Sequence, residues 1–367
     1  MQPVNSQARP HVPGIPFKVM TLCAALCACS SAPLSPYTTD TPPLVLESAV
    51  QAGAKDERAR FREIYCAVLE ARRDVLQDYR PCEQALTRVG AEPAATGKPV
   101  DLGPSRRHLI AAIVPGLGWD CFSDWLNVTG SVVAHLAQFG YDARLIEIGG
   151  LAGTEENALR IHNAVLAMAL PAGERRLVLI GYSKGAPDLL EAIVAYPDIR
   201  QYVAAVISAA GAIGGSPLAD PAKESDTDLL RHVPGARCEK SDGHAVASLR
   251  PGVRQAWLAQ HPLPRDFPYY SLVTFPDPDH ISRVLRSSYH KLSKVDARND
   301  SQLIFYDEVI PGSTLVGYVN ADHWALAVPI NRSHPWITSM FVTRNAYPRE
   351  ALFEALLRFV EEDLETR

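Results

Sequence analysis

The sequence predicts an α/β fold in which helices cover both faces of a mostly parallel central sheet. Three observations lead to this prediction. Short apolar runs alternate with amphipathic helical patterns from residue 107 onward. The runs are continuous, as in strands that are buried on both faces. Each strand–helix unit has the length of a crossover between parallel neighbours.

The predicted elements follow one another in a regular order. Strands are expected at 109–114, 143–148, 177–180, 203–207, 270–275, 303–309 and 314–319. Helical patterns occupy 122–136, 157–170 and 188–196, and a final amphipathic helix opens at Pro348. The alternation stops at about 213–267, a segment rich in Gly, Pro and charge. We expect this segment to be a cap inserted over the edge of the sheet.

The N-terminal segment has the pattern of a targeting sequence. In residues 1–29, basic residues precede a short apolar stretch at 19–28, which is too short to cross a bilayer. The stretch ends in Leu-Cys-Ala-Cys, which resembles a bacterial lipobox and makes Cys29 the expected lipidation site. Cleavage as an ordinary signal peptide is the alternative. Residues 30–53 are then a Ser/Thr/Pro-rich tether, and 54–105 a helical hairpin with a linker.

Composition excludes several functional classes. The 367 residues are 47% hydrophobic and 21% charged, with a net charge of -5, which is typical of a globular protein. No basic stripe favours a nucleic-acid partner. The sequence has no P-loop, dinucleotide fingerprint or metal-binding motif, so we expect no cofactor and no metal. It also has no run of eighteen apolar residues, so no transmembrane helix is expected.

The cysteines suggest disulfides. If Cys29 is the first mature residue, four others remain, an even number in an exported protein. We favour Cys66–Cys82, which would join a local helical hairpin, and Cys121–Cys238. Free buried thiols are the alternative.

The motif with the most chemical content is 181–185 (GYSKG), which matches Gly-x-Ser-x-Gly. It directly follows an apolar strand and directly precedes a helix. This placement holds a serine exposed on a sharp turn, and it makes Ser183 the candidate nucleophile. Gly181 and Gly185 are needed because side chains there would collide across the turn. The amides of the following helix would point toward a developing oxyanion.

From about residue 106 to 367 the sequence resembles the α/β-hydrolase superfamily, within its bacterial lipase and esterase branch. Four segments in the same order carry the resemblance: 114–118 (VPGLG), 181–185 (GYSKG), 211–220 (GAIGGSPLAD) and 320–324 (NADHW). The resemblance implies an α/β-hydrolase fold, with the helical segment 54–105 as a small N-terminal extension. It also implies a catalytic order of serine, acid and histidine.

The resemblance assigns the remaining members of a triad. His323 follows the last predicted strand and is the expected general base. Asp300 is the favoured acid, because 299–303 (NDSQL) resembles the Asn-Asp-Gly string that carries the acid in bacterial lipases. Ser301 replaces the glycine of that string. Asp277 and Asp279 follow the strand at 270–275 and, with Asp307, remain alternative acids.

Two backbone amides are expected to form the oxyanion hole. One is the N–H of Lys184, and the other is the N–H of Leu117 in the loop after the first predicted strand. For the Lys184 side chain we favour contact with solvent or with a nearby carboxylate. The alternative is that it holds an anionic group of the substrate.

These residues predict a serine hydrolase that cleaves carboxylic esters through an acyl-enzyme. An amidase, a thioesterase or an acyltransferase would use the same triad, and a non-catalytic surface lipoprotein could keep the fold. The expected partners are a small-molecule or lipid ester and a membrane reached through the lipid anchor. We expect a monomer in the bacterial cell envelope, or a secreted protein as the alternative.

Overall fold

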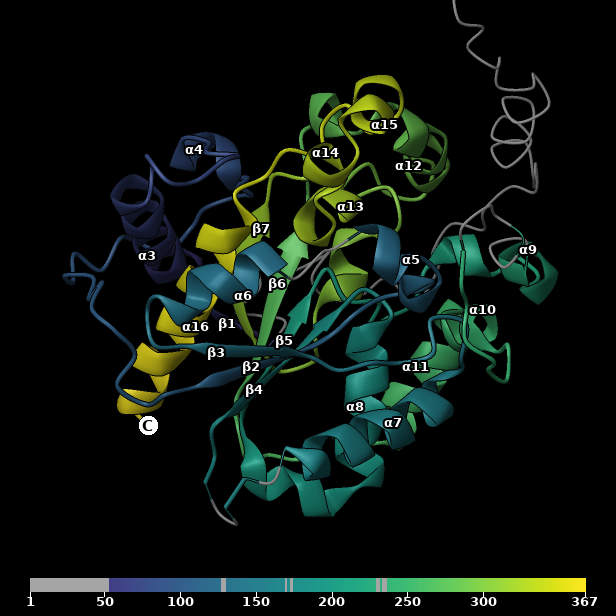
Figure 1. The fold of residues 1–367 in the computed structure, drawn as a ribbon, viewed down its shortest axis with the longest axis horizontal. Coiled ribbons are helices and arrows are strands. Elements are labelled where there is room, and N and C mark those ends of the chain that lie inside the picture. Colours follow the sequence, from purple (N-terminus) through teal and green to yellow (C-terminus); the bar gives the residue numbers. More distant parts are fainter. Residues whose placement is uncertain (1–52, 127–129, 169, 172–173, 229–231, 233–235) are drawn as a thin grey trace, which may run out of the picture. The chain divides into compact units, whose positions relative to one another are not determined.

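The computed structural model describes residues 53–126, 130–168, 170–171, 174–228, 232 and 236–367. A seven-stranded sheet in the order β1-β7-β6-β5-β4-β2-β3 forms its centre (Figure 1). All neighbouring strands are parallel. The strands are β1 (Lys55–Asp56), β2 (Ile110–Val114), β3 (Asp142–Leu145), β4 (Leu177–Tyr182), β5 (Val203–Ala209), β6 (Tyr269–Thr274) and β7 (Thr314–Val319). The predicted fold class is therefore confirmed.

The central strands are apolar on both faces because each face carries a separate core. In β4, Val178 and Ile180 belong to one apolar cluster, whereas Leu177 and Leu179 belong to the other. This is the alternation expected of successive residues in a strand. A sheet with two buried faces needs a layer of helices on each.

Two helical layers fill this requirement. One consists of α3 (Arg58–Ala71), α6 (Gly130–Ala137) and α16 (Arg349–Glu365), whose apolar residues share a cluster with Val178 and Ile180. The other is formed by α7 (Thr154–Ala167) and α8 (Gly185–Ala195), which pack on Leu177 and Leu179. The predicted helical extension is thus built into the first layer through α3.

The remaining helices lie in the connections between strands or between the last strand, β7, and α16. They are α4 (Cys82–Ala85), α5 (Trp119–Leu126), α9 (Glu224–Asp228), α10 (Ala245–Ser248), α11 (Pro251–Gln260), α12 (Arg286–Leu292), α13 (His323–Ala327), α14 (Ile330–Ser333) and α15 (Pro335–Met340). The helices α9, α10 and α11 form the insertion between β5 and β6 (Figure 1).

Two sequence predictions need correction. The segment 303–309 is not a strand but contains a 3-10 helix, Phe305–Glu308. In the sheet, β6 lies between β5 and β7, and β7 lies between β6 and β1, so no position beside β6 or β7 is open for another strand. The helical prediction for 54–90 also missed β1, whose two residues pair with Thr314 and Leu315. Residues 1–52, including the predicted lipidation site Cys29, lie outside the described residues.

Candidate active site

The Gly-x-Ser-x-Gly motif forms a tight turn between β4 and α8. Ser183 has a φ of 54°, in the left-handed region that side chains with a Cβ rarely adopt. A Cβ on Gly181 would lie 2.4 Å from the Cα of Ala186, and one on Gly185 would lie 2.3 Å from the carbonyl oxygen of Val114. Both glycines are therefore required by the turn. The turn leaves Ser183 partly exposed.

Three predicted side chains meet in one hydrogen-bonded chain. Oγ of Ser183 lies 2.9 Å from Nε2 of His323, although the two residues are 140 positions apart. Nδ1 of His323 lies 2.5 Å from Oδ2 of Asp300. The backbone N–H of His323 also donates to the carbonyl oxygen of Asp300, over 3.0 Å. Asp300 thus holds His323 through both its imidazole ring and its backbone.

The surroundings of Asp300 stabilise a carboxylate. Its side chain is fully buried, and its Oδ1 accepts the backbone N–H groups of Gln302 and Leu303, at 2.8 and 2.7 Å. Its Oδ2 accepts the hydroxyl of Thr274 at 2.6 Å as well as the contact with His323. Such donors replace the water that a buried carboxylate loses.

The alternative acids lie elsewhere. The side chain of Asp277 is 63% exposed and accepts a hydrogen bond from Nδ2 of Asn320. Asp279 is exposed. Asp307 is buried with its carboxylate against Gly214. Of the four candidate aspartates, Asp300 is the one that the structure brings into contact with His323.

The predicted oxyanion loop packs against the nucleophile. A Cβ on Gly116 would be 2.8 Å from the Cβ of Ser183 and 3.2 Å from its Oγ. The N–H of Gly118 donates to the carbonyl oxygen of Gly150, which follows β3, and the N–H of Trp119 donates to the carbonyl oxygen of Gly116. Within the described part of the chain, the N–H groups of Leu117 and Lys184 have no backbone acceptor.

The side chain of Lys184 points into the interior of the protein. It is fully buried, and its Nζ lies 2.7 and 2.8 Å from the two carboxylate oxygens of Asp188, one turn along α8. Nδ2 of Asn157 donates to the same carboxylate at 2.7 Å. Burial raises the pKa of Asp188, and Lys184 opposes that shift. Of the two contacts favoured for the Lys184 side chain, solvent or a nearby carboxylate, the structure shows the carboxylate.

Tyr182 contacts His323 in a way that the sequence did not indicate. Its hydroxyl donates to the carbonyl oxygen of His323 at 2.7 Å, and its ring lies 5.1 Å from the imidazole, between ring centroids. The one feature of the sequence that could have pointed to Tyr182 is its position directly before Ser183 in the motif. Thr274 was also missed, because the end of β6 carries no recognisable motif.

The structure contains both favoured disulfides. Cys66 joins α3 to Cys82 in α4, with 5.2 Å between their Cα atoms. Cys121, just after the oxyanion loop, is bonded to Cys238, with 3.9 Å between Cα atoms. The backbone N–H of Arg237 also donates to the carbonyl oxygen of Cys121. The second disulfide therefore fastens α5 to the inserted segment.

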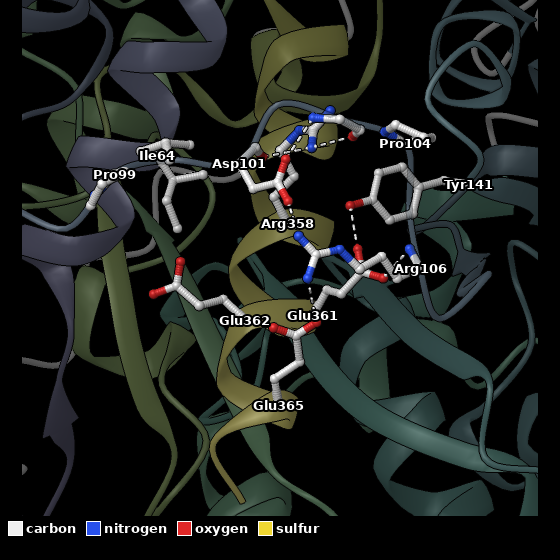
Figure 2. A pocket seen from close by; sticks show the side chains of 12 residues that line it. Ile64, Pro99, Asp101, Pro104, Arg106, Tyr141, Arg358, Glu361, Glu362 and Glu365 are labelled. Carbon is white, nitrogen blue, oxygen red and sulfur yellow. Dashed lines mark hydrogen bonds and ion pairs between the residues drawn. The ribbon is translucent and has the colours of Figure 1, made fainter.

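A separate pocket lies along α16, beside the linker at 99–106 (Figure 2). None of the predicted triad residues lines it. Glu361 accepts hydrogen bonds there from the hydroxyls of Ser105 and Tyr141 and from two backbone amides, so its role is to hold the linker.

Across the described residues no cluster of three or more His, Cys, Asp or Glu has a metal-binding arrangement. The same residues include no helix with the length and apolarity to cross a membrane.

Comparison with solved structures finds a carboxyl esterase that matches the chain over most of its length. The chain is 38% identical to a metagenomic carboxyl esterase known from its crystal structure. That match covers 94% of this chain and 99% of the esterase, with a TM-score of 0.79. A Bacillus licheniformis lipase in its propeptide form is 22% identical, with a TM-score of 0.50 over 62% of this chain and 49% of the lipase, and shows the fold alone. No family model and no curated protein matches the chain.

Proposed function

The chain belongs to the esterase and lipase family of α/β-hydrolases, and we propose that it is a serine hydrolase cleaving carboxylic esters through an acyl-enzyme. One observation carries the proposal. It is the chain of hydrogen bonds from Ser183 through His323 to Asp300, which begins at a serine held in a strained turn. A nucleophile, a base and a group that orients the base are the three parts that this chemistry needs.

Each residue has one role in the proposed reaction. His323 accepts the hydroxyl proton of Ser183 through Nε2 as Oγ attacks the ester carbonyl carbon. The tetrahedral intermediate collapses when His323 returns the proton to the leaving alkoxide, which departs as an alcohol. Water then attacks the acyl-enzyme in the same way and releases the carboxylic acid. Asp300 fixes the tautomer of His323 and stabilises the imidazolium without taking the proton itself.

In the proposed reaction, the N–H groups of Leu117 and Lys184 donate hydrogen bonds to the oxyanion of each tetrahedral intermediate. The proposal is supported by the absence of a competing backbone acceptor for either amide among the described residues. Lys184 also precedes the first turn of α8, whose N-terminal amides carry partial positive charge. Two such donors favour the transition state over the planar ester.

Labelling with a fluorophosphonate probe tests this function directly. The wild-type protein should react once per chain, and peptide mass spectrometry should find the adduct on Ser183. Ser183→Ala should abolish labelling and lower ester turnover by a factor on the order of a million. A correctly folded wild-type protein that resists the probe would contradict the proposal and favour a non-catalytic member of the fold.

The reaction class needs a matched set of substrates. Esters of increasing acyl length should be compared with the amide and the thioester of the same acyl group. Faster turnover of the ester than of both others supports an esterase. Preference for the thioester or amide, or transfer of the acyl group to an added alcohol, would instead identify one of the other reactions of the same triad.

We also propose that residues 1–29 are a lipoprotein signal peptide and that acylated Cys29 anchors the enzyme to the bacterial cell envelope. The support is the apolar stretch at 19–28 followed by Cys29 and the polar tether at 30–53. Labelled palmitate fed to expressing cells should appear on the wild-type protein but not on Cys29→Ser. Equal release of both proteins to the medium would favour an ordinary signal peptide.

A further inference from the structure

A second buried carboxyl group lies behind the proposed catalytic acid. The hydroxyl of Thr274, the last residue of β6, lies 2.6 Å from Oδ2 of Asp300 and 3.0 Å from Oε2 of Glu308. The backbone N–H of Thr274 donates to the same Oε2 at 2.7 Å. All three side chains have no exposed surface. One hydroxyl therefore bridges two carboxyl groups that have no access to water.

Counting protons decides which groups donate. The Thr274 hydroxyl has a single proton, and Asp300 has none to give, because Oδ1 accepts two backbone amides and Oδ2 accepts from His323. The shorter contact, to Asp300, therefore takes the hydroxyl proton. The contact between Thr274 and Glu308 is then a hydrogen bond only if Oε2 of Glu308 carries a proton.

The rest of the environment of Glu308 also favours its neutral form. Its Oε1 is buried and has no hydrogen-bond partner among the described residues, an arrangement that is costly for an ionised carboxylate. Burial raises the pKa of Glu308 well above its usual range. The charges of Asp300 and Asp307 add to this effect, which outweighs the lowering by hydrogen bonds from Thr274. The charge of an ionised Glu308 would also act on the phenols of Tyr182 and Tyr318.

We propose that Glu308 is a neutral carboxylic acid that positions Asp300 through the hydroxyl of Thr274, so that the hydrogen-bonded chain runs from Ser183 to Glu308. This inference rests on the proposed function, since it extends the same triad. Thr274 and Glu308 are positioning residues, because neither touches Ser183 or His323. The chain passes through Oε2 of Glu308, Oγ1 of Thr274 and Oδ2 of Asp300.

The neutral state of Glu308 has a consequence for the base. An additional anion beside Asp300 would favour the protonated imidazole of His323. A protonated His323 cannot accept the proton of Ser183. A neutral Glu308 instead completes the hydrogen bonding of Thr274 without adding negative charge, and the Thr274 hydroxyl stays directed at Asp300.

Substitution of Thr274 tests the link to Asp300. Thr274→Val keeps the shape but removes the hydroxyl, and we expect kcat to fall roughly 10- to 100-fold, as for the loss of a hydrogen bond to a charged group. KM should stay the same, and Thr274→Ser should recover most of kcat. Ser271→Ala is the matched control, since Ser271 is a buried hydroxyl on the same strand that bonds to Ser313 and Ile310. Wild-type kcat in Thr274→Val, or equal losses in all three variants, would overturn the proposal.

Substitution of Glu308 tests its charge. Glu308→Gln removes no charge if the group is neutral, so the acidic limb of the kcat/KM profile should keep its midpoint. A midpoint lowered by about one pH unit or more would show that a negative charge near His323 had been lost.

Infrared difference spectra of wild type against Glu308→Gln should contain the C=O band of a protonated carboxyl group, shifted in heavy water. Absence of that band overturns the proposal, whatever the activity of the variants. Failure of the wild-type enzyme to label with fluorophosphonate would instead count against the proposed function and leave the infrared result unaffected.

Discussion

Gly116 lies so close to Ser183 that a methyl group in its place would come within 2.8 Å of the Ser183 Cβ. Real Cβ atoms do not approach this closely, so the loop or the nucleophile would have to move. Both proposed oxyanion donors flank this contact, with Leu117 next to Gly116 and Lys184 next to Ser183. The contact therefore sets how the oxyanion hole faces the nucleophile.

We predict that Gly116→Ala lowers kcat by at least about 100-fold, the loss seen when one oxyanion donor is misplaced. Labelling of Ser183 should slow in parallel, because the probe also develops negative charge on oxygen. Gly252→Ala is the control, since a Cβ there meets no atom within 4 Å. Full activity of Gly116→Ala would mean that the loop yields freely and does not form the oxyanion hole.

Asp300→Asn should lower kcat by a factor of about 10⁴, because an amide stabilises the wrong tautomer of the histidine. Asp277→Asn and Asp307→Asn should remain near the wild-type value, since neither side chain contacts His323. Steady-state kinetics on the three purified variants would measure this. A large loss in Asp277→Asn together with a small one in Asp300→Asn would transfer the acid role.

Local patterns were sufficient to predict the elbow and most strands. Ser183 follows a continuous apolar strand and lies between two glycines, and both features are short-range in sequence. Asp300 could be preferred to the other candidate acids only because the residues around it resemble a family motif. Asp277 and Asp279 directly follow a predicted strand, whereas Asp300 does not, and nothing local distinguishes a buried aspartate from an exposed one.

The remaining features depend on contacts between distant segments. The bridge between Thr274 and Glu308 spans 34 positions and has no sequence signature. The run at 303–309 is apolar enough for a strand, yet the amides of Gln302 and Leu303 bind the Asp300 carboxylate and turn the chain. Strand β1 has only two residues, too few for any periodic pattern.

Ser301 occupies a backbone conformation that suits glycine better. Its φ is 85°, its side chain is fully buried, and its hydroxyl has no hydrogen-bond partner among the described residues. This position explains why the related motif of lipases carries glycine. We predict that Ser301→Gly stabilises the protein by about 1 kcal/mol, since the relief of strain exceeds the extra entropy of an unfolded glycine.

Thermal unfolding measures this gain, and a rise in Tm of about 2 °C is expected for a chain of this size. Ser301→Ala separates the two causes, because it removes the buried hydroxyl and keeps the strained Cβ. It should therefore gain less than Ser301→Gly. A lower Tm for the glycine variant would show that the Ser301 side chain stabilises the loop that carries Asp300.

The neutral state of Glu308 also makes a prediction about folding that does not depend on catalysis. The unfolded chain releases the Glu308 proton near pH 4.3, whereas the folded protein retains it, because burial and then Asp300 raise its pKa. The folded state thus binds more protons, and this group lowers the free energy of unfolding as the pH rises above that value. Glu308→Gln should therefore gain stability relative to wild type by up to about 1.4 kcal/mol per pH unit.

Urea unfolding of both proteins at several pH values from about 5 to 8 would measure the difference. Glu350→Gln provides a control of opposite sign. Burial acts to raise the pKa of Glu350, but the hydrogen bond and positive charge of Arg332, together with a backbone hydrogen bond and one from Ser131, lower it overall. That carboxylate stabilises the fold above its unfolded pKa, so its removal should cost stability throughout the range. If the stability difference between Glu308→Gln and wild type instead stayed constant as the pH rose, Glu308 would be ionised in the folded protein.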